Sequence, residues 1–220
     1  GGAFRRADGL DVNHIAALDD GAWQPIGRPG AQTNGPVSSL EVFDDGHGES
    51  IYAGGSFTRS GTGNVNRIAR WDDDHWVEVG GGANERVAAL RTFDDGSGPA
   101  LYAGGAFTSI GEDNYAHIAR WDGLTWSNVG DGLNGEVRCF AVFDDGDGPA
   151  LYAGGYFTAS GKEPVSRIAR WDGTQWQPLG AGVNAAVLTM TVFDDGNGPA
   201  LYVGGWFSVA GTVNASHIAR

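Results

Sequence analysis

Hydrophobic and polar positions form short runs along this chain. Val187–Phe193 and Leu201–Phe207 are rich in β-branched, apolar and aromatic residues, and Arg167–Trp171 and Trp176–Leu179 are shorter runs of the same kind. Such runs, separated by Asp and Gly, are typical of β-strands. No apolar stripe with the 3.6-residue period of a helix continues for ten residues without Gly. The pattern therefore predicts β-strands and no helix.

The runs return at a fixed spacing. Phe57, Phe107, Phe157 and Phe207 are each 50 residues apart, and Phe4 precedes Phe57 by 53. A period of about 20–50 residues indicates a repeat architecture, in which each unit buries its apolar face on its neighbours. We divide the chain, as a single repeat domain or a fragment of one, into units one to five: 1–36, 37–86, 87–136, 137–186 and 187–220.

Each complete unit is expected to contain four strands, named A to D in chain order. In the last unit, Val187–Phe193 is strand A and Leu201–Phe207 is strand B; in the unit before it, Arg167–Trp171 is strand C and Trp176–Leu179 is strand D. Four strands per ~50 residues, with paired Gly and spaced Trp, are typical of a β-propeller blade.

The strand pattern also predicts how the repeat begins and ends. Strands B and C are expected five times, starting with a strand B at Gly1, and strands A and D four times, which makes 18 strands. The first unit lacks strand A and the last lacks strand D. We therefore predict an all-β propeller of four-stranded antiparallel blades, five in number with two incomplete. A slice of a six- or seven-bladed ring, and a ring closed by pairing the terminal pieces, are the alternatives.

Three features of each unit carry a family resemblance. They are the Gly pair that ends strand B (Gly104-Gly105), an aromatic residue followed by Asp (Trp171-Asp172) and a Trp on strand D (Trp176). In these features the whole chain resembles kelch-type propellers, although Trp171 and Trp176 are closer together than kelch spacing and Trp replaces the usual Tyr. The unit is also similar to repeats of fungal cortical polarity markers and of large bacterial surface proteins. The resemblance implies the architecture and, more weakly, an interaction role.

Charge and composition exclude several classes of function. The chain has 14 Lys and Arg against 27 Asp and Glu, a net charge of −13, which argues against nucleic-acid binding because phosphates need a basic surface. No apolar run approaches the roughly 20 residues of a membrane span, so we predict no membrane insertion. The start at Gly1, without Met, suggests a piece of a larger secreted or cell-surface protein.

The acidic residues are concentrated in turns. The segment Asp-Asp-Gly-x-Gly follows strand A in four units, starting at Asp44, Asp94, Asp144 and Asp194. Adjacent acids followed by Gly lack the alternate acids and distal Glu of a calcium loop, and only Asp147 adds a carboxylate. We therefore predict hairpin turns without a metal or other cofactor, with Ca²⁺ as the alternative.

Other recurring polar residues have structural explanations. Arg70, Arg120, Arg170 and Arg220 recur on strand C and are expected to pair with a neighbouring Asp or a strand-end carbonyl between blades, although a ring of Arg would also suit an anion. His14, His117 and His217 share a position that is Arg in two other units, which argues against a metal site. Cys139 replaces Ser, Ala or Thr and is expected to be a packing residue.

The units differ mainly in two kinds of loop. The A–B and C–D turns barely change, whereas the B–C segments and the D–A loops vary, and both of these emerge on the same face of a four-stranded meander. Loops on a rigid scaffold commonly carry binding sites. The predicted ligand-binding residues are therefore the polar and aromatic residues of the B–C segments: Arg5, Arg6, Arg59, Asp113, Tyr115, Lys162 and Glu163.

Near-identical repeats favour binding over catalysis, because an active site requires asymmetry that only the loops provide. We expect a non-catalytic binding or structural module for a protein or carbohydrate partner, with no catalytic residues. The alternatives are a lectin with repeated sugar sites and a glycan hydrolase or lyase that uses the loop face. The sequence does not define the oligomeric state.

Overall fold

The computed structural model describes residues 1–27 and 30–220, and this part of the chain consists of β-strands and turns with no helix. It therefore contains no helix that could cross a membrane. Units two, three and four each form one four-stranded antiparallel sheet in the order A-B-C-D. Their strands are β5 (Val37–Asp44), β6 (Glu49–Gly55), β9 (Ile68–Asp72) and β10 (His75–Glu78); β11 (Val87–Asp94), β12 (Pro99–Gly105), β15 (Ile118–Trp121) and β16 (Trp126–Ser127); and β17 (Val137–Asp144), β18 (Pro149–Gly155), β21 (Ile168–Trp171) and β22 (Trp176–Pro178).

The terminal units are incomplete, as predicted, but unit one has one strand fewer than expected. It contains β3 (Ala16–Asp19) and β4 (Ala22–Pro25), and unit five contains β23 (Val187–Asp194), β24 (Pro199–Gly205) and β27 (Ile218–Ala219). The predicted strand B at Gly1 is wrong, because the chain forms no strand before Arg6. In a complete unit, strand B lies between A and C. In unit one there is no A, and the first residues make a few separate backbone bonds, such as the Gly2 amide to His14 O and the His14 amide to Phe4 O.

The B–C segments contain small hairpins that the sequence pattern did not predict. Each unit has one two-stranded hairpin before its strand C. The hairpins are β1 (Arg6–Ala7) with β2 (Leu10–Asp11), β7 (Arg59–Ser60) with β8 (Gly63–Asn64), β13 (Ser109–Ile110) with β14 (Asp113–Asn114), β19 (Ala159–Ser160) with β20 (Glu163–Pro164), and β25 (Val209–Ala210) with β26 (Val213–Asn214). The variable segments are therefore ordered structures.

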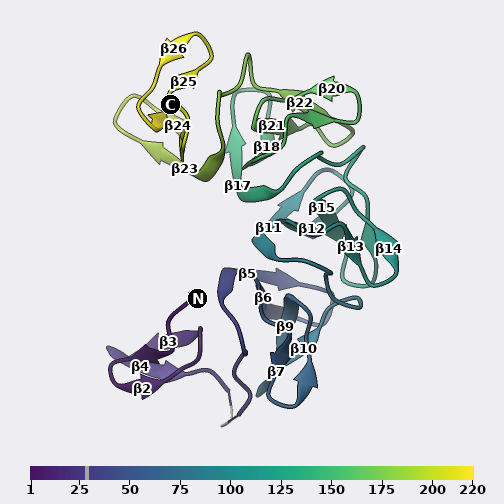
Figure 1. Ribbon diagram of the computed structural model, residues 1–220, viewed down its shortest axis with the longest axis vertical. Coiled ribbons are helices and arrows are strands. Elements are labelled where there is room, and N and C mark those ends of the chain that lie inside the picture. Colours follow the sequence, from purple (N-terminus) through teal and green to yellow (C-terminus); the bar gives the residue numbers. More distant parts are fainter. Residues whose placement is uncertain (28–29) are drawn as a thin grey trace.

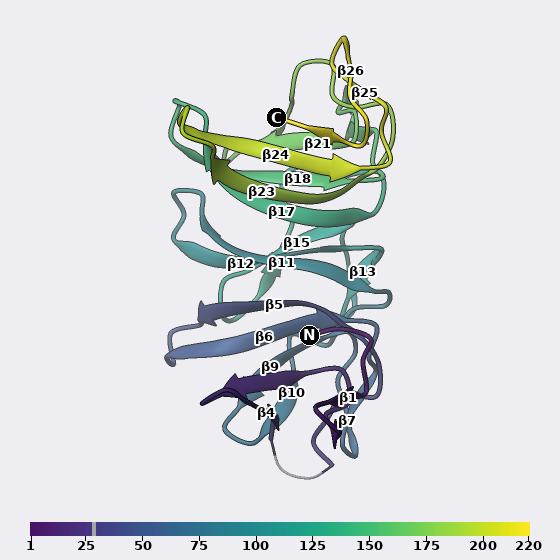
Figure 2. The same ribbon diagram turned by 90° about the vertical axis from the view of Figure 1, so that its left-hand side faces the viewer.

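The sheets follow one another along an open arc (Figure 1). The A strands β5, β11, β17 and β23 lie side by side along its inner side (Figure 2). Both termini lie on the open side, and the described residues close no ring. The arrangement of repeated antiparallel sheets is compatible with a β-propeller-like fold.

The hydrophobic core lies between consecutive sheets. One cluster joins Tyr52 and Ile68 of unit two to Leu101, Phe107 and Trp121 of unit three. The Gly pair that ends strand B permits this close packing: a Cβ on Gly104 would lie 2.6 Å from Val137 Cγ1 of the next unit, and one on Gly105 would lie 2.1 Å from Arg86 O. A side chain at either position would therefore push apart the segments that pack there.

Candidate functional site

The stack of sheets has two rims of different character. The A–B and C–D turns form one, here called the turn rim. A Cβ on Gly123, in the C–D turn of unit three, would lie 2.6 Å from Asp45 O in the A–B turn of unit two. The B–C hairpins and the D–A loops form the other, here called the hairpin rim (Figure 2). The prediction that the two variable loop types share a face is confirmed, because Ala83 of a D–A loop bridges Ile110 of a hairpin.

On the turn rim, the acidic residues bind the turn's own backbone. Asp94 Oδ1 accepts hydrogen bonds from the amides of Gly96 (2.9 Å) and Gly98 (3.0 Å), and Asp95 Oδ1 accepts one from Ser97 (3.1 Å). The same bonds recur in the turns that begin at Asp44, Asp144 and Asp194. The prediction of hairpin turns is confirmed, and the turn backbone occupies these carboxylate oxygens.

The second acidic residue of each turn also holds a Tyr from strand B. Asp145 Oδ2 accepts the hydroxyl of Tyr152 at 2.7 Å, and Arg170 Nε lies 3.3 Å from the same oxygen. Arg70 and Arg220 make the equivalent ion pairs, whereas Arg120 donates to the Gly98 carbonyl at 3.0 Å. The predicted Asp or carbonyl partners are thus found, but within the same unit and not between blades. The reason is that the A–B turn and strand C of a unit belong to the same sheet, which brings the Arg next to the turn of its own unit.

Burial and hydrogen bonding fix the ionisation of these clusters. Burial would raise the pKa of Asp95, but hydrogen bonds from Tyr102, the Ser97 amide and the Trp171 indole hold it below its usual value. Burial first, and then the bond to Asp145, raise the pKa of Tyr152 to about 12. At neutral pH the Asp is therefore charged and the Tyr is a neutral hydrogen-bond donor. This arrangement stabilises the turn, and neither group changes its protonation near neutral pH.

The described His and Cys residues do not come together in a metal site. No group of three or more His, Cys, Asp or Glu comes together as a metal site would require within residues 1–27 and 30–220. The His14, His117 and His217 backbones have φ of 79°, 64° and 68°, so their shared position is a left-handed kink before strand C. Cys139 Sγ lies 3.8 Å from Gly154 O, and burial raises the pKa of its thiol to about 12. Cys139 is therefore a packing residue, as expected.

A repeated Asn fastens each D–A loop to the hairpin beside it. Asn84 Oδ1 accepts from the amides of Thr108 (2.9 Å) and Ser109 (3.1 Å), and its Nδ2 donates to Thr108 Oγ1 (3.0 Å). Equivalent bonds are made by Asn34, Asn134 and Asn184. We call this arrangement the Asn clasp. It holds the base of four hairpins in the same way, whatever residues their tips carry.

Six of the seven predicted binding residues are exposed on the hairpin rim. They are Arg5, Arg6, Arg59, Asp113, Lys162 and Glu163. Arg6 pairs with Asp11 of its own hairpin at 2.8 Å. No hydrogen bond or ion pair links a described candidate of one hairpin to one of another. The structure places these residues on a common rim without bringing them together in one pocket.

The prediction for Tyr115 is wrong, and the positions of the D–A loops differ in burial. Tyr115 is only 5% exposed and packs in the core with Ile110 and Trp121, so it is not displayed to a ligand. Its counterparts Val65 and Val165 are buried as well. In the D–A loops, Ala83 and Leu133 are buried. Other variable positions of these loops, such as Glu85 and Asp131, are exposed, so the D–A loops and the hairpins both contribute exposed variation to the hairpin rim.

The hairpin rim also carries residues that sequence reasoning missed. The residue after the Gly pair is small in units one to three but is Tyr156 in unit four and Trp206 in unit five. Their rings form an edge-to-face pair with centroids 5.9 Å apart, and Trp206 is 63% exposed. An exposed Trp packed on a second aromatic ring forms a contiguous apolar patch, and such patches mark interaction sites.

An ion cluster adjoins this aromatic pair. Glu136 accepts from Arg86 and lies 3.3 Å from Arg138 Nη1, while its carbonyl accepts the Tyr156 amide at 2.8 Å. The aromatic pair and the ion cluster therefore form one surface, here called the aromatic patch, to which units two to five contribute. The signal in the sequence was the exchange of small residues for Tyr and Trp at one repeat position.

Comparisons with known proteins add no further assignment, since no protein family, no curated protein and no solved structure matches the chain. The kelch-like resemblance therefore stays a prediction.

Proposed function

We propose that this protein is a non-catalytic binding module that engages a protein partner through its hairpin rim, with the aromatic patch at the centre of the contact. The observation that carries the proposal is the exposed Trp206 packed on Tyr156, whose amide donates to the carbonyl of Glu136, the partner of Arg138. Trp, Tyr and Arg are the residue types that dominate the binding energy of protein interfaces. The module belongs to a larger secreted or cell-surface protein, as its likeness to bacterial surface repeats suggests.

The rigid frame supports this role. The Asn clasps and the bridges between D–A loops and hairpins fix the base of each hairpin, so the exposed tips carry Arg59, Asp113, Lys162 and Glu163 at set positions. A preorganised surface loses little conformational freedom on binding. These charges lie on the same rim as the aromatic patch, and interfaces commonly combine an apolar centre with a polar periphery.

A carbohydrate partner is the second candidate, and the flat exposed face of Trp206 favours it. A lectin with one sugar site per unit has less support, because Ala3, Ser56 and Ala106 stand at the positions equivalent to Trp206. The glycan hydrolase or lyase alternative would use the hairpin rim, where the acidic candidates Asp113 and Glu163 lie on hairpins of different units.

The kelch-like, five-bladed architecture is part of the same proposal. The three complete sheets, the two partial ones and the inner row of A strands support it. A slice of a larger ring has the same internal contacts and is the alternative.

The proposal is tested by binding screens followed by substitution. An array of cell-surface ectodomains and a glycan array, the latter with and without Ca²⁺, are probed with the wild-type chain. Any binding partner is then measured against Trp206→Ala and, as a matched control, Leu124→Ala, which removes a side chain 82% exposed on a C–D turn. We expect Trp206→Ala to weaken binding at least ~10-fold and the control to have no effect. Equal binding by both variants would refute the role of the patch.

A further inference from the structure

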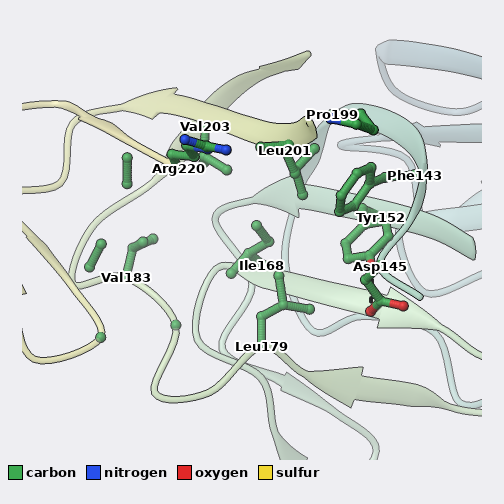
Figure 3. A pocket seen from close by; sticks show the side chains of 15 residues that line it. Phe143, Asp145, Tyr152, Ile168, Leu179, Val183, Pro199, Leu201, Val203 and Arg220 are labelled. Atoms are coloured by element: carbon green, nitrogen blue, oxygen red, sulfur yellow. Dashed lines mark hydrogen bonds between the residues drawn. The ribbon is translucent and has the colours of Figure 1, made fainter. Parts of the chain in front are cut away.

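Two cavities adjoin unit four and differ in character. The cavity between units four and five is apolar, and Figure 3 shows Ile168, Leu179 and Leu201 in its lining. The cavity between units three and four is polar and has a volume of about 250 Å³. Its polar side chains come from the D–A loop of unit three and from the hairpin and C–D turn of unit four: Asp131, Ser160, Glu163, Thr174 and Gln175.

The polar cavity has two carboxylates without a cationic partner. Asp131 and Glu163 are exposed, and neither makes a hydrogen bond or an ion pair with any described residue, including Lys162 beside Glu163. Asp131 lies against the tip of the hairpin that carries Glu163, because a Cβ on Gly161 would collide with Asp131 Oδ2. Negative charges gathered in a cleft attract a cation.

A buried hydroxyl without a partner lies in the same cavity. Ser160 is only 6% exposed, and its hydroxyl forms no hydrogen bond with a described residue. Ser60, at the equivalent position of unit two, donates to the Ala31 carbonyl at 2.6 Å. Buried polar groups normally have a hydrogen-bond partner. The Ser160 hydroxyl is therefore available to a group that enters the cavity.

The other junctions do not repeat this combination. At the position of Asp131, the other D–A loops have Ala31, Gly81 and Ala181. At the position of Glu163, the hairpins of units two, three and five have Gly63, Asp113 and Val213. Asp113 has no acid opposite it, because Gly81 replaces Asp131 there. The pair of acids therefore occurs only at the junction of units three and four.

Hydrogen bonds hold the walls of the cavity in place. Asn134 Oδ1 accepts from the amides of Thr158 (2.7 Å) and Ala159 (2.9 Å), directly before Ser160. The Trp176 indole, in the third wall, donates to the Val129 carbonyl at 3.2 Å. A ligand therefore meets a preorganised site and need not order it.

The size and chemistry of the cavity favour a guanidinium group. A water molecule takes about 30 Å³ of liquid volume, so the cavity is much larger than a bare metal ion. The carboxylates, the Ser160 hydroxyl and the Gln175 side-chain carbonyl are all acceptors, and a guanidinium has five donors in a planar fork that matches carboxylates. A guanidinium also packs on aromatic rings, and Trp176 is in the lining.

We propose that the cavity between units three and four binds the guanidinium group of an Arg side chain that the protein partner presents to the hairpin rim. For the existence of that partner this inference rests on the proposed function, and it names the chemistry that the partner must carry. The loop that contains Asp131 continues to Glu136 of the aromatic patch, so the two surfaces share one loop.

The test uses short peptides as probes and needs no identified partner. Amide shifts of the ¹⁵N-labelled chain are followed by NMR during titration with acetyl-Gly-Arg-Gly-amide. Saturable shifts are expected at Ser160, Gly161 and Gln175. The citrulline analogue, which has nearly the same shape without the charge, should cause no such shifts. The lysine analogue should bind more weakly, because an ammonium is a point charge without the planar fork.

Substitutions locate the binding in the cavity. Asp131→Asn and Glu163→Gln each remove one charge and should weaken binding of the Arg peptide at least ~10-fold. Ser160→Ile introduces the residue that unit three has at this position, fills the cavity and should abolish binding. Asp113→Asn removes the exposed acid of the equivalent hairpin position and is the matched control, with unchanged binding. Circular dichroism checks that each variant folds, and the two isosteric variants decide the outcome if Ser160→Ile does not.

Several results would overturn the proposal. They are the absence of saturable shifts with the Arg peptide, equal binding of the citrulline or lysine analogue, and binding unchanged by Asp131→Asn and Glu163→Gln. The same shifts with CaCl₂ alone would assign the cavity to a metal ion and would overturn it as well. None of these results bears on Trp206→Ala, which is measured with the partner itself, so this inference and the proposed function fail separately.

Discussion

The two rims of this protein use repetition in opposite ways. On the turn rim the same Asp, Tyr and Gly recur in every A–B turn, and their polar groups bond to one another. On the hairpin rim the Asn clasp recurs, but the residues it supports change from unit to unit. The comparison teaches that sequence identity between units marks groups engaged in structure. Differences between units, at positions that are also exposed, mark surfaces free to bind.

The largest effect should come from removing an acceptor on the turn rim. Asp95 accepts from Tyr102 and from Trp171 of the next unit, so Asp95→Ala leaves two buried donors without a partner. We expect a loss of about 2–4 kcal/mol in the free energy of unfolding, measured by urea denaturation.

The matched control for that change is Asp195→Ala. Asp195 accepts from the half-buried Tyr202 and pairs with Arg220, and no described Trp indole donates to it. Its loss should be clearly smaller. Equal losses at the two positions would break the link between burial and the structural role of the turn rim.

A smaller loss is expected from the Asn clasp. Asn84→Ala removes three hydrogen bonds that join a D–A loop to a hairpin, at an exposed site where water competes for them. We expect about 1–2 kcal/mol by urea denaturation. Asn84→Asp keeps the acceptor for Thr108 and Ser109 and should retain most of the stability; if it is as unstable as the Ala variant, the backbone bonds are not what the clasp contributes.

The turn rim should also make stability dependent on acid. Burial opposes the shift at Asp172, but amide bonds from Gln175 and Thr174 lower its pKa below the usual value, and the pKa of Asp145 is lowered as well. Because the folded pKa lies below the unfolded one, the stabilisation is fully present above about pH 4 and is lost as the pH falls toward the folded pKa. Thermal melts from about pH 6 to pH 2.5 should show a falling Tm, and Asp172→Asn should fall less than wild type.

The sequence predicted the strands of the frame well, because their signals are periodic. Val187–Phe193 and Trp176–Leu179 match β23 and β22 to within a residue at each end. The B–C hairpins were missed because two-residue strands have no alternation to detect, although Gly61, Gly111, Gly161 and Gly211 recur at their tips with positive φ. The strand B at Gly1 was predicted because residues 1–7 resemble strand B of the other units. In those units strand A pairs with strand B, and unit one has no strand A.

The candidate site was predicted only in part, for a related reason. Variation between units located the hairpin rim but did not separate exposed from buried variation, so Tyr115 was taken with Asp113 although only the latter is exposed. The aromatic patch depends on contacts between units, such as the ion pair of Arg86 with Glu136, and a single unit's sequence does not show these contacts. Arg86 and Glu136 are 50 residues apart and occupy the same repeat position, so opposite charges one period apart were the available signal.

The smallest change in stability should come from the tips of the hairpin rim, and it completes the comparison. Lys162 and Glu163 are exposed and make no hydrogen bond or ion pair with described residues of another hairpin. The double variant Lys162→Ala, Glu163→Ala should alter the free energy of unfolding by no more than about 0.5 kcal/mol, because exposed side chains without partners contribute little. Urea denaturation measures this, with Asp95→Ala as the positive reference. A loss of the size expected for Asp95→Ala would mean that the hairpin tips are structural, and the distinction between an engaged rim and a free one would fail.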